Sequence, residues 1–261
     1  MRMAASKKTE SRYGRPWNRE ELILAFDLYC RIPFQRTKAS NPRVQELAVL
    51  LGRTPAAVAR KLGNFGAFDP ELQRRGISGL VHVGRLDKEI WEEFHQDWNS
   101  LVLEAEKLRE QLSEKQIELE RLVSPNGASE ALRETKARLH QRFFREAVLS
   151  SYNEVCCITG LSIPECLIAG HIVPWSVDET RRADPRNGLC LSATFDRLFD
   201  KGLLTVGPNM RVIMSGSLVD RKDEAIQHQV ACFHNQEIRL PSRFLPSEDC
   251  LEWHRRNVFR P

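Results

Sequence analysis

One stretch of the chain combines a histidine with two carboxylates at spacings that could support hydrolysis. His171 lies near the end of a mostly apolar segment, 167–173. Asp196 and Asp200 are four residues apart in a segment, 193–200, with helical character. Residues at this spacing share one face of a helix. The stretch therefore predicts a strand-end histidine that faces two carboxylates, which is a suitable arrangement for metal-assisted hydrolysis of a phosphodiester.

A strand, a loop, a second strand and a helix are expected to position these side chains. Ser192 is a suitable N-cap for the helix and Gly202 a suitable stop. The predicted boundaries are 167–173 for the first strand, 176–186 for the polar loop, 188–191 for the second strand and 193–200 for the helix. Two short strands and one helix would bring the polar residues together at one end of a small α+β unit.

The residue types suit this chemistry. Histidine has an unperturbed pKa of about 6.5, so it is mostly neutral at cellular pH and can accept a proton from water. Carboxylates without thiolates favour a hard cation such as Mg²⁺. Taken singly, His171 could instead be a core histidine on an apolar strand, and Asp196 and Asp200 could belong to a solvated helix face.

Four motifs in this stretch resemble, in order and spacing, those of the HNH endonuclease family in a bacterial restriction-like branch. They are CCITG at 156–160, HIVPW at 171–175, NGLCL at 187–191 and DRLFDKG at 196–202. The resemblance implies an α+β fold. A helical N-terminal domain and a long connecting helix would precede a C-terminal ββα-metal nuclease domain.

The resemblance also implies a role for each polar residue. His171 would be the general base, and Asn187 would brace the loop that orients it. Asp196 would ligate a divalent metal, Mg²⁺ first with Mn²⁺ or Ni²⁺ as alternatives, and Asp200 corresponds to a second ligand in some members. Many members carry a further Asp or His ligand just before the base, where this chain has Gly170. Weak affinity for free metal is therefore expected.

The N-terminal half predicts a helix-turn-helix-like hairpin. One helix over 43–51 ends at Gly52, and Thr54 caps a second helix that runs to about residue 65. The second helix could enter a groove of double-stranded DNA, or the pair could be an ordinary αα-hairpin in a helical bundle. The candidate DNA contacts are Arg53, Thr54, Arg60, Lys61 and Asn64, with Arg142 and Arg145 on a later amphipathic helix.

Composition shifts suggest five segments. A basic flexible arm (1–15) is followed by a helical, DNA-binding domain (16–95), a heptad-patterned connecting helix (96–123), a Pro/Gly/Ser linker (124–129) and the nuclease domain (130–261). Leucine and alanine at seven-residue spacings along 101–122 predict a homodimer seam. The alternative is a single helix that packs against its own chain. The seam residues are Leu101, Ala105, Leu108, Leu112, Leu119 and Leu122.

Composition excludes several classes of protein. Seven cysteines, an odd number with Cys156 and Cys157 adjacent, indicate buried thiols rather than a disulfide framework, and no structural zinc is expected. No apolar run approaches the roughly 18 residues of a membrane span, and no signal peptide is recognisable, which predicts a cytoplasmic protein without a membrane partner. The net charge of +4 is mild and compatible with nucleic acid as a partner.

These observations predict a metal-dependent DNA endonuclease, in a setting of restriction or defence against foreign DNA. The alternative is a non-catalytic DNA-binding or regulatory protein whose nuclease half has degenerated, and Gly170 is the residue that supports it. His254, beside Trp253 and Arg255, is interpreted as a packed or surface histidine rather than a catalytic one.

Overall fold

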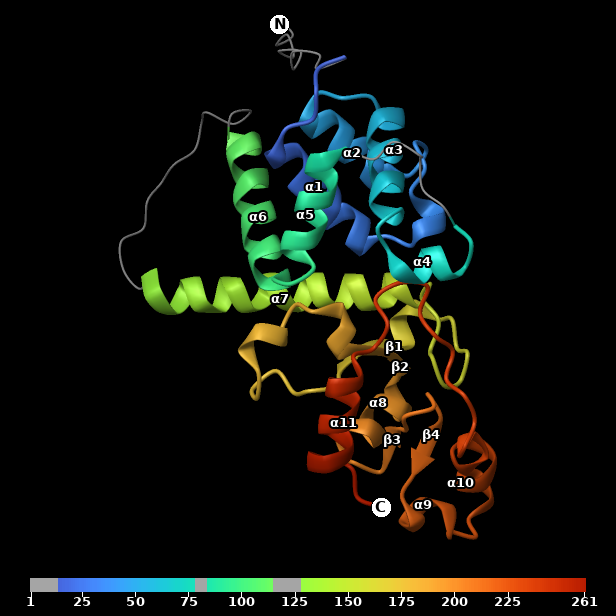
Figure 1. Cartoon of the computed structure of the whole chain (residues 1–261). Coiled ribbons are helices and arrows are strands. Elements are labelled where there is room, and N and C mark those ends of the chain that lie inside the picture. The colour runs from blue at the N-terminus through green and yellow to red at the C-terminus, as the bar shows by residue number, and fades with distance from the viewer. Residues whose placement is uncertain (1–13, 78–83, 115–127) are drawn as a thin grey trace, which may run out of the picture.

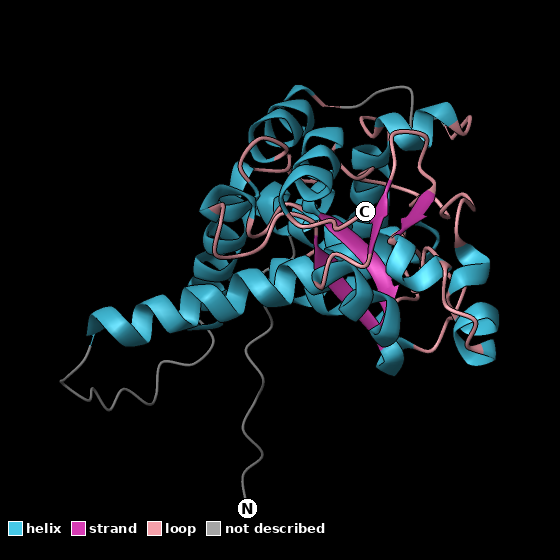
Figure 2. Cartoon of the chain, turned by 90° about the horizontal axis from the view of Figure 1, so that it is seen from below, coloured by secondary structure: helices cyan, strands magenta, loops and turns pink. Residues whose placement is uncertain are grey.

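One long helix, α7 (Ala128–Ser151), lies between an all-helical N-terminal half and a C-terminal half that carries the strands (Figure 1). The structure is a computed structural model that describes residues 14–77, 84–114 and 128–261, without the side chains of 114 and 128–133. Figure 2 shows the strands gathered together with helices around them. The α+β class expected from the sequence is confirmed.

The N-terminal half is a helical bundle built around α1. Nearly every residue of α1 is buried, and Asn18 and Glu21 form a capping box at its start. Gly52, in the left-handed conformation with φ of 64°, ends α2, and Thr54 caps α3 by accepting from the Ala57 amide. The elements are α1 (Arg19–Arg31), η1 (Phe34–Arg36), α2 (Pro42–Leu51), α3 (Pro55–Gly66), α4 (Pro70–Arg74), α5 (Arg85–Phe94) and α6 (Trp98–Glu114).

The described part of the predicted dimer seam is covered by its own chain. Leu101, Ala105 and Leu108 of α6 are buried in the core of the helical bundle, and Leu112 packs at its edge. In this part of the chain the alternative, a helix that packs against its own bundle, is what the structure shows. Leu119 and Leu122 lie outside the described residues, as do residues 1–13 of the predicted arm and 124–127 of the predicted linker.

The C-terminal half contains two small antiparallel sheets. In the first, β1 pairs with β2 and His171 lies opposite Gly188; in the second, β3 pairs with β4. The elements are η2 (Pro164–Cys166), β1 (Leu167–His171), η3 (Glu179–Arg181), η4 (Pro185–Asn187), β2 (Gly188–Ser192), α8 (Ala193–Asp200), β3 (Leu204–Val206), β4 (Val212–Met214), α9 (Gly216–Val219), α10 (Glu224–Gln229), η5 (Ala231–Phe233) and α11 (Glu248–Asn257).

Helix α7 belongs to both hydrophobic cores. Phe143 and Ala147 lie in the core of the helical half, whereas Phe144 and Val148, one position further along the same helix, lie in the core of the C-terminal half. Residues four apart share a helix face, so adjacent faces of α7 serve the two cores. The predicted nuclease domain, 130–261, thus shares its first helix with the N-terminal half.

The cysteines differ in part from expectation. Five of the seven are buried, but Cys166 and Cys232 are exposed, so the prediction of buried thiols is wrong for these two. Both lie at short 3-10 turns on the surface, where apolar neighbours in the sequence do not guarantee burial. Among the residues that the structure describes, no helix is long and apolar enough to cross a membrane.

Candidate active site

His171 is the last residue of β1, and its ring packs against α7. The ring stacks on Phe144 with centroids 3.5 Å apart and planes at 10°, and the Trp175 ring meets it edge-on at 5.8 Å. Its strand partner is Gly188, where a Cβ would lie 2.4 Å from Val148 Cγ2. Only glycine therefore lets α7 approach the hairpin closely enough for this stacking.

A backbone carbonyl orients the ring of His171. The Nε2 atom lies 3.1 Å from the carbonyl oxygen of Arg182. Because a carbonyl oxygen can only accept, Nε2 carries the proton and Nδ1 carries the lone pair. Burial lowers the pKa of His171, and the bond to the Arg182 carbonyl offsets part of that effect. The ring is therefore neutral at pH 7, with Nδ1 as the nitrogen that can accept a proton.

Asn187 ties together the two ends of the loop between β1 and β2. Its Oδ1 accepts from the Val173 amide at 2.8 Å, and its Nδ2 donates to the Val173 carbonyl at 3.0 Å and to the Arg181 carbonyl at 3.4 Å. The Asn187 side chain is fully enclosed, at 1% exposure. These bonds hold the loop that carries the Arg182 carbonyl, as a bracing residue would.

Asp196, in the first turn of α8, approaches the residue before His171. An ideal Cβ on Gly170 would lie 2.6 Å from Asp196 Oδ1, so the carboxylate rests against the bare strand backbone. Burial first, and then the negative charge of Asp200, raise the pKa of Asp196 to about 6, and the positive charge of Arg197 offsets part of this rise. Asp200 is exposed one turn further along the helix.

Asp196 and His171 contact opposite faces of the hairpin. Gly170 meets Asp196 of α8, whereas His171 meets Phe144 of α7. Successive strand residues point to opposite faces, so neighbours cannot share one. The face-to-face arrangement expected from the sequence is thus not observed. Both groups nevertheless lie at the same end of the hairpin, because Gly170 and His171 are adjacent and His171 ends β1.

The two carboxylates suit a cation that water and substrate also ligate. Within the described ranges, no group of three or more His, Cys, Asp or Glu residues could hold a metal ion. Mg²⁺ is commonly bound by one or two carboxylates, with water and substrate phosphates as further ligands. The like charge of Asp200 that raises the pKa of Asp196 is a repulsion that a divalent cation would relieve. Asp196 and Asp200 therefore fit a metal site of weak affinity, in which water and the substrate supply the remaining ligands.

Arg53, a predicted DNA contact, is engaged inside the helical half. Its guanidinium donates to both carboxylate oxygens of Glu21, at 3.0 and 2.7 Å, and lies 4.3 Å from the centroid of the Trp17 ring. The side chain is 5% exposed. Arg53 therefore links the turn before α3 to α1, and its side chain does not face solvent.

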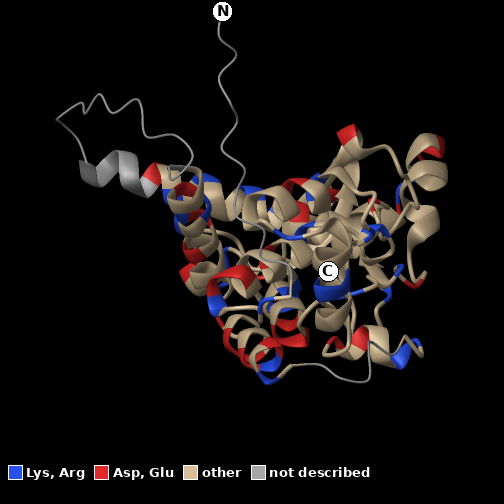
Figure 3. Ribbon diagram, turned by 90° about the horizontal axis from the view of Figure 1, so that it is seen from above, with Lys and Arg blue, Asp and Glu red and all other residues tan. Residues whose placement is uncertain are grey.

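Helix α3 presents only part of its predicted DNA-contacting set. Lys61 donates to both carboxylate oxygens of Asp87 on α5, and Asn64 donates to the same carboxylate. Arg60 and Thr54 are exposed. Lys61 and Asn64 are three residues apart, so they share the face that α5 covers. Acidic and basic residues are interspersed over the helical half (Figure 3).

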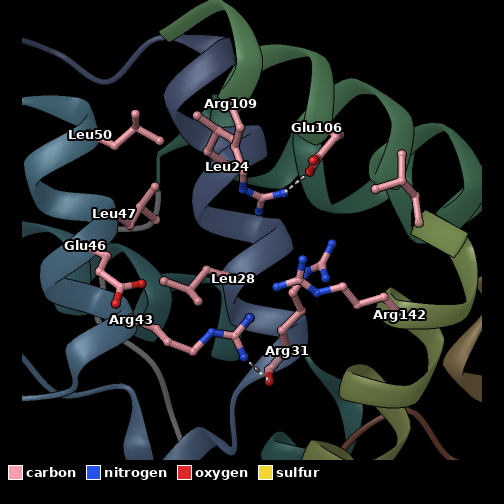
Figure 4. Close-up of a pocket in the computed structure, with 11 residues that line it drawn as sticks. Leu24, Leu28, Arg31, Arg43, Glu46, Leu47, Leu50, Glu106, Arg109 and Arg142 are labelled. Carbon is pink, nitrogen blue, oxygen red and sulfur yellow. Dashed lines mark hydrogen bonds and ion pairs between the residues drawn. The ribbon is translucent and has the colours of Figure 1, made fainter. Parts of the chain in front are cut away.

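Arg142 and Arg145 of α7 have different surroundings. Arg142 lines a cavity of about 390 Å³ among α1, α2, α6 and α7, together with Arg31, Arg43 and Arg109 (Figure 4). Arg145 is exposed and donates to the Leu167 carbonyl at 2.9 Å, at the start of β1. Of these two arginines, only Arg145 contacts the C-terminal half.

The guanidinium groups of the cavity are paired within the protein. Glu146 is approached by Arg31, Arg43 and Arg142, at 3.3, 2.8 and 3.3 Å. Arg109 pairs with Glu106 and with the buried Asp27, which Arg31 also binds. The arginines at this cavity thus contribute first to the junction of α1, α2, α6 and α7.

His254 is a packed histidine, as predicted. Its Nδ1 lies 2.9 Å from Thr205 Oγ1, its Nε2 lies 3.2 Å from the Phe199 carbonyl, and its ring stacks on Phe199. Burial lowers its pKa to about 4.

Two residues that contribute to the site, Phe144 and Arg182, were not predicted from the sequence. Arg182 acts on His171 through a backbone carbonyl, which leaves no residue-type signal, and Phe144 was one apolar residue among several on its helix.

Comparison with known proteins found one family model that matches the segment carrying these residues. Residues 156–207 match the family model described as HNH endonuclease. The matched segment contains both strands of the first sheet, the loop between them and α8, and with them His171, Asn187, Asp196 and Asp200. No curated protein matches the chain significantly. Residues 156–207 of this chain are thus similar in sequence to the HNH endonuclease family.

Proposed function

We propose that the protein is a metal-dependent endonuclease that hydrolyses phosphodiester bonds in double-stranded DNA. The observation that carries the proposal is the neutral His171, held at the end of a hairpin whose other face bears Asp196, inside the segment that matches HNH endonucleases. A phosphodiester that lies across that end of the hairpin can be reached from both faces. We assign the activity to restriction or defence against foreign DNA in the cytoplasm.

His171 acts as the general base in this proposal. Its Nδ1 takes a proton from water, the water oxygen bonds to phosphorus, and the ester bond breaks. The leaving oxygen keeps the electron pair of that bond and takes up a proton from solvent. Phe144 and the Arg182 carbonyl keep the ring in the correct orientation and tautomer. Asn187 keeps the loop that supplies this carbonyl in place.

Asp196 is the principal metal ligand in the proposal, and Asp200 is the second. HNH nuclease domains generally use a divalent metal, and an oxygen-only donor pair favours Mg²⁺, with Mn²⁺ or Ni²⁺ as alternatives. When bound, such an ion offsets the negative charge that develops on the phosphate and the leaving oxygen. On the DNA side we retain Arg60 and Thr54 of α3 and Arg145 of α7, whose side chains are exposed.

Substitution of His171 tests the assignment. In a plasmid-nicking assay with Mg²⁺, Mn²⁺ or Ni²⁺, His171→Ala is expected to lower the cleavage rate about 100-fold or more, because general bases contribute about 10²- to 10⁴-fold. His228→Ala, a change of an exposed histidine on α10, is the matched control and should cleave like the wild type. Full cleavage by folded His171→Ala protein would contradict the assignment. Plain, methylated, hydroxymethylated and phosphorothioated DNA should each be tested as the substrate.

A second candidate function is non-catalytic DNA binding by a protein whose nuclease half has degenerated. Gly170 in a ligand position, and the lack of a three-ligand cluster within the described ranges, favour it. Wild-type protein that shifts DNA in a gel but leaves every substrate uncut with each of the three metals would support this candidate and overturn the first.

A further inference from the structure

Asn99 of α6 binds the loop that orients His171. Its Nδ2 donates to the Glu179 carbonyl at 2.8 Å and to the Thr180 carbonyl at 3.3 Å, and its Oδ1 accepts from the Ala183 amide at 3.1 Å. The Asn99 side chain thus hydrogen-bonds to the backbone on both sides of Arg182. The carbonyl of Arg182 is the group that meets His171 Nε2.

Other contacts dock the same loop on the helical half. Ala183 is fully buried within the core of the N-terminal helices. Arg186 donates to the His95 carbonyl at 3.1 Å, at the end of α5, while Asp184 holds its guanidinium. Asn99 differs from these anchors because it alone, in the described part of the chain, hydrogen-bonds on both sides of residue 182 from α6.

We propose that Asn99 is a positioning residue for His171, acting through the loop segment 179–183. By fixing this segment it fixes the Arg182 carbonyl, and the carbonyl sets both the orientation and the tautomer of the histidine. Asn99 lies outside the matched residues 156–207, so the family match assigns it no role. According to the proposal, α6 of the helical half helps to position the general base. The proposal rests on the proposed function only for the experiments that measure DNA cleavage.

Two substitutions test the proposal kinetically. Asn99→Asp keeps the shape and the acceptor for the Ala183 amide but loses both donors and faces two carbonyls with a carboxylate. Asn99→Ala loses all three bonds. For cleavage of a short DNA duplex at saturating metal, both variants should lower kcat by about 10- to 100-fold with KM within about twofold, because a misoriented group costs rate rather than affinity. Gln111→Ala, an exposed amide on the same helix, should leave both constants unchanged.

Two structural measurements do not require activity. In the wild type, the His171 imidazole N–H should give a slowly exchanging proton signal in ¹⁵N-histidine-labelled protein, which His171→Gln identifies by its loss. Asn99→Ala should abolish this signal and speed hydrogen exchange of the Ala183 amide, while amides of α1 keep their protection.

Three outcomes would overturn the positioning role. They are an unchanged kcat in both Asn99 variants, an unchanged His171 N–H signal in Asn99→Ala, or a loss of kcat that accompanies faster exchange throughout α1 and α6. Wild-type protein that cuts no DNA would instead overturn the proposed function. In that case the His171 signal and the Ala183 exchange would still decide whether Asn99 positions the histidine.

Discussion

Gly170 and Asp196 form a matched pair at the residue scale. The carboxylate of Asp196 occupies the space that any side chain at position 170 would fill, since even a Cβ would come within 2.6 Å of Oδ1. The resemblance to HNH endonucleases implies an Asp or His here in many members. In this chain such a residue and the present position of Asp196 exclude each other. The absence of a side chain at position 170 is therefore what allows Asp196 to take its present position.

Gly170→Ala should lower activity while the fold is retained. The added methyl group displaces the Asp196 carboxylate, so we expect the cleavage rate to fall about tenfold or more and half-maximal cleavage to need more metal. Gly63→Ala is the matched control, because a Cβ at Gly63 meets nothing within 4 Å. Rates measured over a Mg²⁺ titration check this. An unchanged titration for Gly170→Ala would show that Asp196 does not hold the ion.

At the scale of elements, a C-terminal segment closes the helical half. Arg243 is fully buried and its guanidinium donates to the carbonyls of Tyr29 and Ile32 at 2.5 and 2.8 Å, and to Ser150 Oγ at 3.2 Å. The last carbonyls of a helix have no partner within it. Arg243 thus caps the end of α1 and joins it to α7.

Removal of Arg243 should destabilise the junction of the two halves. Arg243→Ala empties a fully buried site and removes the guanidinium donor from the carbonyls of Tyr29 and Ile32. We expect a loss of about 3 kcal/mol in the free energy of unfolding, since lost packing and unsatisfied groups both contribute. Urea unfolding measures it. Arg260→Ala, at an exposed arginine, should change stability by less than about 0.5 kcal/mol. Equal effects of both substitutions would contradict the capping role.

At the scale of the whole molecule, each half contains a histidine that burial keeps neutral, the half-buried His95 and the buried His254. Burial lowers the pKa of His95, in the helical half, to about 4, and does the same for His254 in the C-terminal half. Both would have an unperturbed pKa of about 6.5 in the unfolded chain. Between these values the unfolded state binds more protons, so both halves should lose stability as the pH falls from about 6.5 towards 4.

A histidine substitution can isolate one of these contributions. Wild-type protein should lose on the order of 2 kcal/mol more than His254→Gln between pH 7 and pH 4.5, because glutamine does not titrate. Urea unfolding at the two pH values gives the difference. His228→Gln, at an exposed histidine, is the control and should keep the wild-type pH dependence. Parallel pH dependence in wild type and His254→Gln would mean that His254 is not held neutral by burial.

Much of the local structure could be predicted from the sequence. The boundaries of 193–200 for α8, and Thr54 as the cap of α3, agree with the structure. Caps, stops and apolar periodicity act within about one turn of helix or one strand, so they are visible in neighbouring residues. The order of the four motifs was also sufficient to indicate the family, which the match over 156–207 confirms.

The tertiary structure decided which of the predicted groups could meet. Strand alternation places His171 against α7 and Asp196 against Gly170. Packing buries the described part of the seam and directs Arg53 and Lys61 inward. Asn99 binds a loop 80 residues further along the chain. Partners this distant are chosen by how whole elements pack, and a local sequence pattern carries no information about that choice. The sequence alone determined which chemical groups are present, and the packing of α6, α7 and α8 around one hairpin determined where they point.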